Sequence, residues 1–131
     1  MIKERYCSYE VARLLKEKGF SEPVRSFYLI DDAHSNAVNV TYSITYRNVN
    51  SAKAILRPTH QMACDWLREV HHICITIYPD NEKGFEAVFY DIESDVEITL
   101  QSFGIYGFHI FGNSYEEAVD AAIKYSLENL V

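Results

Sequence analysis

The chain has 131 residues, of which 48% are hydrophobic and 24% charged, and its formal net charge is −7. A chain of this length and composition can bury a core large enough to fold without a disulfide or a metal, and it does not have the composition of a disordered protein. The charge is uneven, with ten basic and eight acidic side chains up to Tyr78, but two basic and eleven acidic from Pro79 onward. Because such an acidic half repels phosphate backbones, we expect no binding to nucleic acid.

Three cysteines occur, an odd number without close spacing, at Cys7, Cys64 and Cys74. This pattern is typical of free thiols in a reducing compartment, not of a secreted disulfide framework. The first residues carry charge but no continuous apolar segment, and no apolar run approaches the length of a membrane span. We therefore expect a soluble cytoplasmic protein that does not bind membranes.

The N-terminal third predicts one helix and two strands. Ser8 can cap a helix over Tyr9–Lys18, and Gly19 is placed to end it in a left-handed conformation. A short apolar strand is expected at Ser26–Ile30. Apolar and polar residues alternate most regularly over Val38–Tyr46, which predicts a strand with one buried and one wet face.

The stretch Pro58–Tyr78 predicts a helix that passes almost directly into a strand. Thr59 can cap the helix, which is expected to end near Val70. One helix face then carries the apolar residues Met62, Ala63, Trp66, Leu67 and Val70. From Ile73 the period becomes two, as on a half-buried strand. Such a helix must fold back over the sheet that its strand joins.

The acidic half predicts three or four strands and a final helix. A hairpin loop at Pro79–Gly84 leads to a strand at Phe85–Ile92, and a third strand alternates from Val96 to Leu100. Three glycines in Phe103–Gly112 indicate a bulged or bent strand. Ser114 and Glu117 form a capping box for a helix that runs to about Asn129, whose expected buried stripe is Tyr115, Ala118, Val119, Ala122, Ile123, Ser126 and Leu130.

The order is therefore α-β-β-α-β-β-β-α over residues 1–131. Strands grouped in runs predict a single α+β domain with an antiparallel sheet and helices packed on one face. The residues that we expect to share the core are Trp66, Leu67, Ile75, Phe89, Val119 and Ala122.

Candidate catalytic and metal-binding residues do not form a recognisable motif. His60 and Cys64 have i, i+4 spacing, with His71, His72 and Cys74 nearby, but neither a CxxC nor an HExxH pattern is present. We interpret these residues as buried cysteines and surface histidines, and expect no metal site.

Two further possibilities concern catalysis. Carboxylates cluster at Asp91–Glu97 and at Asp31–Asp32, where solvated turns are the simpler interpretation. Cys7 precedes a helix, but the sequence places no histidine or asparagine to complete a dyad, so we interpret it as a small buried residue. We predict no catalytic residue and no cofactor.

Three blocks, CSYEVARLLKEKGF, PTHQMACDWLREVHH and NSYEEAVDAAIKYSLENL, resemble a family of small proteins of phages, prophages and mobile elements of gut anaerobes. That family carries no assigned activity, so the resemblance implies no catalytic residue. The segment Ile73–Val131 is similar in its expected arrangement to HicB-like antitoxin domains. With the preceding helix it also resembles the order of double-stranded-RNA-binding domains, but the last helix offers Lys124 alone in place of their lysine cluster.

These patterns favour a non-catalytic protein-interaction module of a phage or mobile element. The alternative is a small enzyme or ligand-binding protein with a pocket between helix and sheet. We expect a protein partner or a homo-oligomer, contacted through Val38–Tyr46 or Tyr106–Phe111, if either strand lies at a sheet edge. The alternative is that both segments are interior strands of the domain, without a role in binding. The candidate interface residues are Tyr42, Tyr46, Tyr106 and Phe108.

Overall fold

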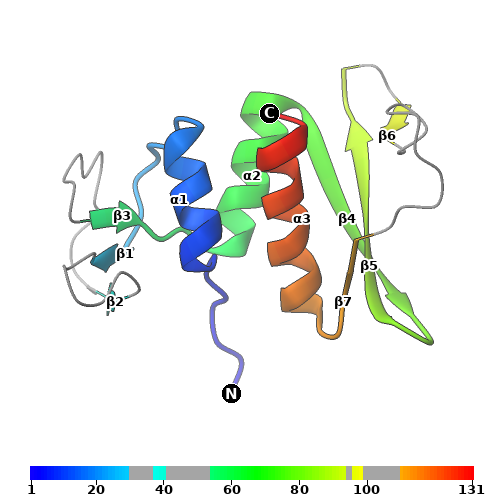
Figure 1. Ribbon diagram of the computed structural model, residues 1–131, viewed down its shortest axis with the longest axis horizontal. Helices are drawn as coiled ribbons and strands as arrows, with labels where there is room; N and C mark the ends of the chain where they lie inside the picture. The colour runs from blue at the N-terminus through cyan, green and yellow to red at the C-terminus, as the bar shows by residue number, and fades with distance from the viewer. Residues whose placement is uncertain (30–36, 41–53, 94–95, 99–109) are drawn as a thin grey trace. The chain divides into compact units, whose positions relative to one another are not determined.

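The computed structural model describes residues 1–29, 37–40, 54–93, 96–98 and 110–131 (Figure 1). The chain divides into two compact units, Met1–Met62 and Ala63–Val131, and each is described by itself. Helices and antiparallel sheets occur together, which confirms the α+β class and the predicted succession of helices and strand runs. That the whole chain forms one domain stays a prediction.

The first unit contains helix α1 (Tyr9–Glu17) and strands β1 (Ser26–Leu29), β2 (Ala37–Val40) and β3 (Ala54–Leu56). The strands form a three-stranded antiparallel sheet in the order β2-β1-β3. We did not predict β3, because three residues are too few to show a period. Of the predicted strand Val38–Tyr46, only the part within β2 falls in the described residues.

Helix α1 begins at Tyr9 as predicted and ends at Glu17, one residue before the predicted Lys18, which is its C-cap. The Ser8 hydroxyl accepts a hydrogen bond from the Val11 N–H at 3.3 Å. Gly19 has φ +93°, and the Phe20 N–H donates to the Leu15 carbonyl at 2.9 Å. The core of this unit joins the buried residues Ala12, Tyr28 and Ile55, which come from α1, β1 and β3.

The second unit contains a four-stranded antiparallel sheet built around one long strand. Its elements are β4 (Ile73–Asp80), β5 (Gly84–Asp91), β6 (Val96–Ile98), β7 (Ile110–Gly112) and α3 (Tyr115–Asn129). Strand β5 pairs with β4 over its whole length, and it pairs with both β6 and β7 as well. Helix α2 (His60–His71) leads into this unit, and none of the described helices is long and apolar enough to cross a membrane.

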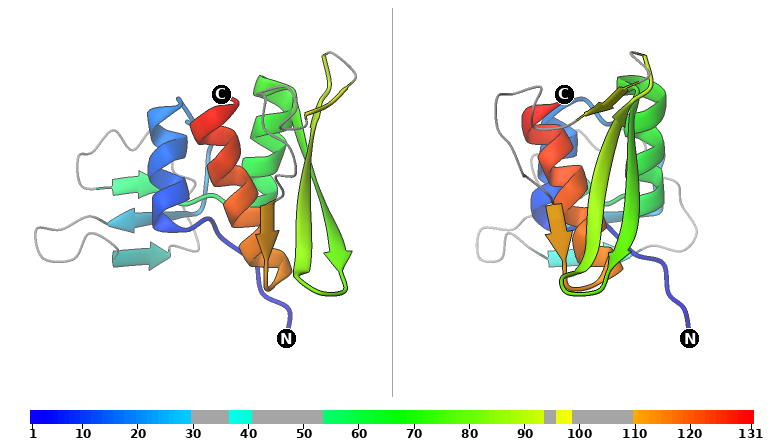
Figure 2. Two further views of the ribbon diagram at one scale, coloured as in Figure 1. Left: turned by 45° about the vertical axis from the view of Figure 1, so that its right-hand side comes forward. Right: turned by 90° about the vertical axis from the view of Figure 1, so that its right-hand side faces the viewer.

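Helix α3 packs against β4, β5 and β7 and covers one face of this sheet (Figure 2). The core between them consists of the buried residues Ile73, Ala87, Phe89 and Ala122. Of the six predicted core residues, Trp66, Leu67, Phe89, Val119 and Ala122 are buried and Ile75 is partly buried.

Two residues that we placed on buried helix faces are exposed. Val70 is 51% exposed in the last turn of α2, where the chain already turns toward β4. Tyr115 is 51% exposed at the first position of α3, and its ring lies edge-on against Phe85 at a centroid distance of 5.9 Å. Both predictions were wrong because a helical stripe continues in the sequence beyond the surface that covers it.

The junctions around α2 and α3 follow the predicted signals. The Thr59 hydroxyl accepts from the Met62 N–H at 3.1 Å at the start of α2, and His72 alone, with φ 60°, separates this helix from β4. At the start of α3 the Ser114 hydroxyl accepts from the Glu117 N–H at 3.1 Å, which confirms this half of the capping box. The Glu117 carboxylate accepts from the Asn113 N–H at 3.0 Å.

Candidate functional site

Strand β4 lies at one edge of the sheet of the second unit. The strand order is β4-β5-β6, with β7 also on β5, so β4 pairs with β5 alone among the described residues. The pairing runs without a bulge through eight consecutive residue pairs, from Ile73 with Asp91 to Asp80 with Gly84. The outer edge of β4 therefore offers a regular row of backbone groups that no other described strand pairs with.

The two faces of β4 differ in what covers them. Ile73, Ile75 and Ile77 point toward the core under α3 and pack against it, although Ile75 and Ile77 are only partly buried. On the opposite face Thr76 and Tyr78 are exposed, and the exposed fraction of Tyr78 is 52%. Strand β4 thus has one apolar face that is only partly buried and one exposed face that carries the aromatic ring of Tyr78.

Strand β2 is one of the two edges of the other sheet within the described residues, since it pairs with β1 alone, as β3 does. This position meets the condition that we set for strand addition at Val38–Tyr46, but only for the described part of that strand. The candidate interface residues Tyr42, Tyr46, Tyr106 and Phe108 lie outside the described residues, so their roles stay predictions.

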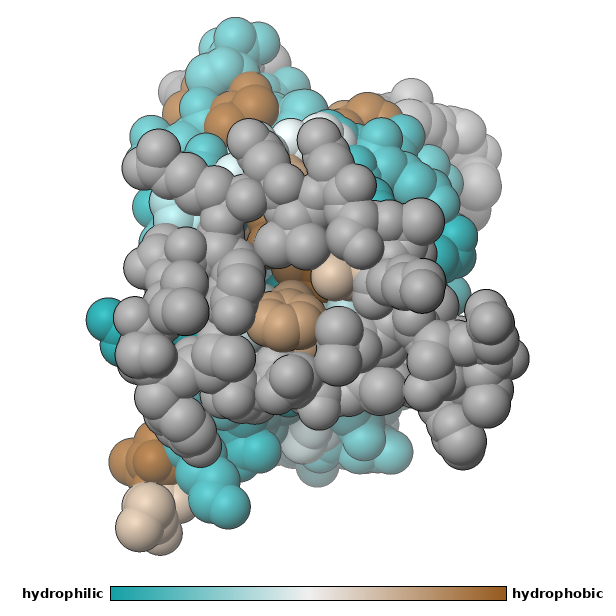
Figure 3. Space-filling view, turned by 90° about the vertical axis from the view of Figure 1, so that its left-hand side faces the viewer, coloured by the Kyte–Doolittle hydropathy of each residue, from teal (hydrophilic) through white to brown (hydrophobic). Residues whose placement is uncertain are grey.

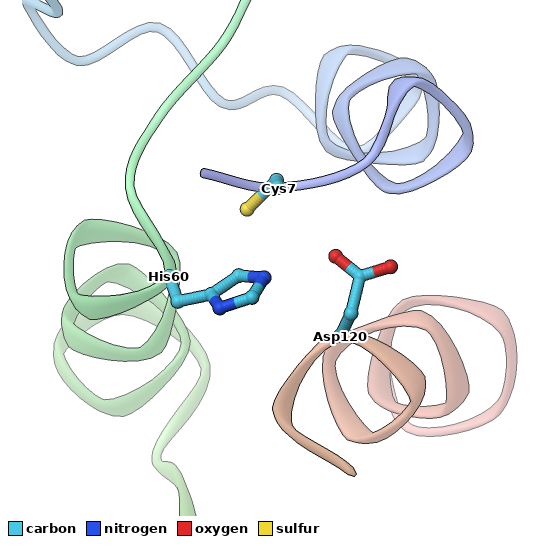
Figure 4. Close-up of side chains that lie close together, drawn as sticks. All are labelled: Cys7, His60 and Asp120. Carbon is cyan, nitrogen blue, oxygen red and sulfur yellow. The ribbon is translucent and has the colours of Figure 1, made fainter. Parts of the chain in front are cut away.

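Cys7 and His60 lie close together in the first unit. The Tyr6–Thr59 bridge aligns their segments, and the Cys7 sulfur lies within 4.8 Å of a His60 ring nitrogen. Figure 4 shows the thiol pointing toward the ring; Asp120, also labelled there, belongs to the second unit and is not counted with this pair. Sequence reasoning missed the pair, because residues so far apart meet only through this bridge.

The Cys7–His60 pair is poorly suited to nucleophilic catalysis. Cys7 is fully buried, and its thiol donates a weak hydrogen bond to the Thr59 carbonyl at 3.8 Å. This confirms our interpretation of Cys7 as a small buried residue. Cys7 and His60 supply only two protein ligands, fewer than the three or four that zinc sites use. Our expectation that the chain has no metal site stays a prediction.

Arg57 is a second feature that the sequence did not indicate. Its guanidinium carbon lies 4.1 Å from the ring centroid of Tyr6 and 5.4 Å from that of Tyr28. One terminal nitrogen donates to the Ser26 hydroxyl at 3.3 Å, while the buried Nε has no acceptor among the described residues. The stacked cation ties the N-terminal segment to the sheet of the first unit and stabilises it.

Of the other predicted candidates, Asp31, Asp32 and Asp95 lie outside the described residues, and Cys64, Asp91 and Glu93 are described. Burial, with a smaller contribution from Asp65, raises the pKa of the Cys64 thiol to about 11, so this thiol is a poor nucleophile. The Asp91 carboxylate accepts from the Glu93 N–H at 3.0 Å, and Glu93 lies 3.5 Å from the His72 ring. The Asp91 carboxylate thus helps to hold the turn that follows β5.

The charge of the second unit is strongly one-sided. Residues Ala63–Val131 include thirteen acidic and three basic side chains, a net charge of −10 with histidine neutral. The three basic residues already have partners: Arg68 pairs with Asp65, Lys124 lies 3.9 Å from Glu128, and Lys83 lies over the Phe111 ring. The acidic excess is therefore not neutralised within the unit.

The first unit, with nine basic and six acidic side chains, carries the opposite sign. Figure 3 colours the surface residues by hydropathy, from hydrophilic to hydrophobic. The described atoms visible at the centre of that view are mostly apolar.

Comparisons with known proteins add no assignment. The chain matches no protein-family model, and no similar curated protein or solved structure was found.

Proposed function

We propose that this chain is a non-catalytic protein-interaction module that takes an extended segment of another polypeptide onto β4. The observation that carries the proposal is the edge position of this strand, whose bulge-free pairing with β5 leaves the other side unused among the described residues. In strand addition, main-chain hydrogen bonds supply affinity, and alternate side chains supply specificity.

The sequence of β4 lacks the usual protection of an edge strand. Proteins block exposed edges with lysine, proline, bulges or very short strands. The stretch Ile73–Tyr78 contains no charged residue and no proline, and only Pro79 and Asp80 at the end of the strand would limit an added partner. Six consecutive residues are thus open to pairing, which is the length of an ordinary strand.

The resemblance to proteins of phages and mobile elements belongs to this proposal as its biological setting. The HicB-like arrangement adds an analogy, that of a small domain whose task is to hold another protein. For an enzyme or ligand-binding protein, the described residues offer the Cys7–His60 pair, and the burial of Cys7 does not favour that function.

The proposal is tested by selecting peptides from a random linear display library against the full chain. Selected peptides should lose at least about tenfold in affinity with Thr76→Lys, which places a charge on the open edge. The matched control is Asn81→Lys, which makes the same charge change at an exposed position in the β4–β5 turn. Hydrogen exchange should show added protection at β4 amides in the complex.

Two results would count against the proposal. Either no linear peptide is enriched, or the enriched peptides bind Thr76→Lys as well as the parent chain and leave β4 amides unprotected. Circular dichroism of both variants verifies that a loss of binding does not reflect a loss of folding.

A further inference from the structure

The side chains beside the free edge of β4 define what an added strand must present on each face. Neighbouring strands place their side chains on the same two faces, in register. On the α3 side the added strand would lie beside Ile75 and Ile77, which pack on the core but stay partly exposed. Apolar side chains at alternate positions would cover these two isoleucines.

On the other face the added strand would lie beside Thr76 and Tyr78. Tyr78 is half exposed, and its direct partner across the sheet is Glu86. A tyrosine ring next to a carboxylate is a favourable environment for a guanidinium or ammonium group.

The charge of the whole unit acts in the same direction. With a net charge of −10 and its three basic side chains already engaged, the second unit attracts cationic chains and repels anionic ones. A second copy of this chain paired through β4 would bring two such acidic units together. Charge therefore favours a basic partner over self-association at this edge.

We infer that the segment bound at β4 is an extended basic segment in which apolar residues alternate with lysine or arginine. This inference rests on the proposed function and adds the chemistry of the partner to it. The apolar residues cover Ile75 and Ile77, and the basic residues lie over the exposed ring of Tyr78.

Three synthetic peptides of equal length test the inference against the full chain by fluorescence anisotropy. One alternates valine with lysine, one alternates valine with glutamate, and one has the lysines and valines in separate blocks. The alternating basic peptide should bind at least about tenfold more tightly than either of the others at about 0.05 M salt. Its advantage over the acidic peptide should shrink at about 0.5 M salt, because screening removes the attraction between charges.

A pair of matched tyrosine variants locates the basic face. Tyr78 and Tyr115 are 52% and 51% exposed in the same unit, but only Tyr78 lies on β4. Tyr78→Ser should weaken binding of the alternating basic peptide about threefold to tenfold, as expected for loss of a cation–π contact, while Tyr115→Ser should leave it unchanged.

The outcomes separate this inference from the proposed function. If the alternating acidic peptide binds at β4 as tightly as the basic one, the inference is overturned and strand addition stands. If the block peptide binds as tightly as the alternating one, attraction is only electrostatic and the inference is also overturned. If Thr76→Lys changes the binding of no peptide, both the inference and the proposed function fail.

Discussion

Replacing Gly112 with alanine should destabilise the second unit by about 3 kcal/mol, because β7 and α3 approach each other there without room for a side chain. A Cβ at this position would lie 2.3 Å from the Ala118 nitrogen and 2.8 Å from both the Ala118 Cα and the Glu117 carbonyl carbon. Non-bonded heavy atoms prefer about 3.5–4.0 Å, so the two backbones would have to separate by more than about 1 Å.

Neither backbone can move freely. Gly112 pairs with Phe85 of β5, and α3 is held by its Ser114 cap and by the fully buried Ala118 and Ala122. Overpacking of this kind costs about 1–3 kcal/mol, and the upper part of that range applies when the obstructing atoms belong to the backbone.

Gly19→Ala is the control, since Gly19 has φ +93° but no atom within 4 Å of the added Cβ. It should cost only about 1–2 kcal/mol for the left-handed conformation. Urea unfolding followed by far-UV circular dichroism measures both variants, and the fluorescence of Trp66 reports on the second unit. The reasoning is refuted if Gly112→Ala loses no more stability than Gly19→Ala.

Three further predictions address the core, the stacked arginine and the partly buried thiol of Cys64. Trp66→Ala should lower the free energy of unfolding by about 3–5 kcal/mol, because the Trp66 side chain is only 7% exposed. A loss below about 1 kcal/mol in urea titration would contradict the core position of Trp66. Arg57→Ala should lower stability by about 1–2 kcal/mol, with Arg57→Lys intermediate because lysine keeps the charge but not the planar stack on Tyr6; equal unfolding midpoints for all three chains would show that the stack contributes nothing. Alkylation of Cys64, followed by mass spectrometry, should still accelerate between pH 9 and 11, because burial raises its pKa from 9.0 to about 11. An alkylation rate of Cys64 that is already constant at pH 9 would contradict this prediction. Since the pKa of Cys64 is higher in the folded state than in the unfolded state, the stability that this thiol contributes is full below about pH 9 and is lost as pH rises through about 11.

Elements with local signals could be predicted from the sequence. Ser8 with Gly19, and Ser114 with Glu117, act through hydrogen bonds that span at most a few residues, so these helix ends were confirmed. The alternation from Ile73 likewise showed which face of β4 lies toward the core. Both signals depend only on residues close together in the sequence, so the sequence alone predicts them.

Features that depend on distant pairing could not be predicted. The Cys7–His60 pair exists because Tyr6 bridges to Thr59, and nothing in either segment indicates the other. The edge position of β4 follows from the choice of partners made by β5, which pairs with both β6 and β7 on its other side. Edge strands and interior strands can carry the same alternating pattern, so only the topology distinguishes them.

The hairpin of β4 and β5 also has a consequence for the order of folding. Its closing pair, Asp80 with Gly84, is four residues apart in sequence, whereas Ala87 and Ile110 of the β5–β7 pair are twenty-three apart. Closing the longer loop costs about 1.5 kcal/mol more chain entropy, which favours early formation of the hairpin. In pulse-labelled hydrogen exchange we expect β4 and β5 amides to gain protection before those of β7. During that interval both long edges of the nascent hairpin are open, and newly made chains are then most exposed to mispairing with one another.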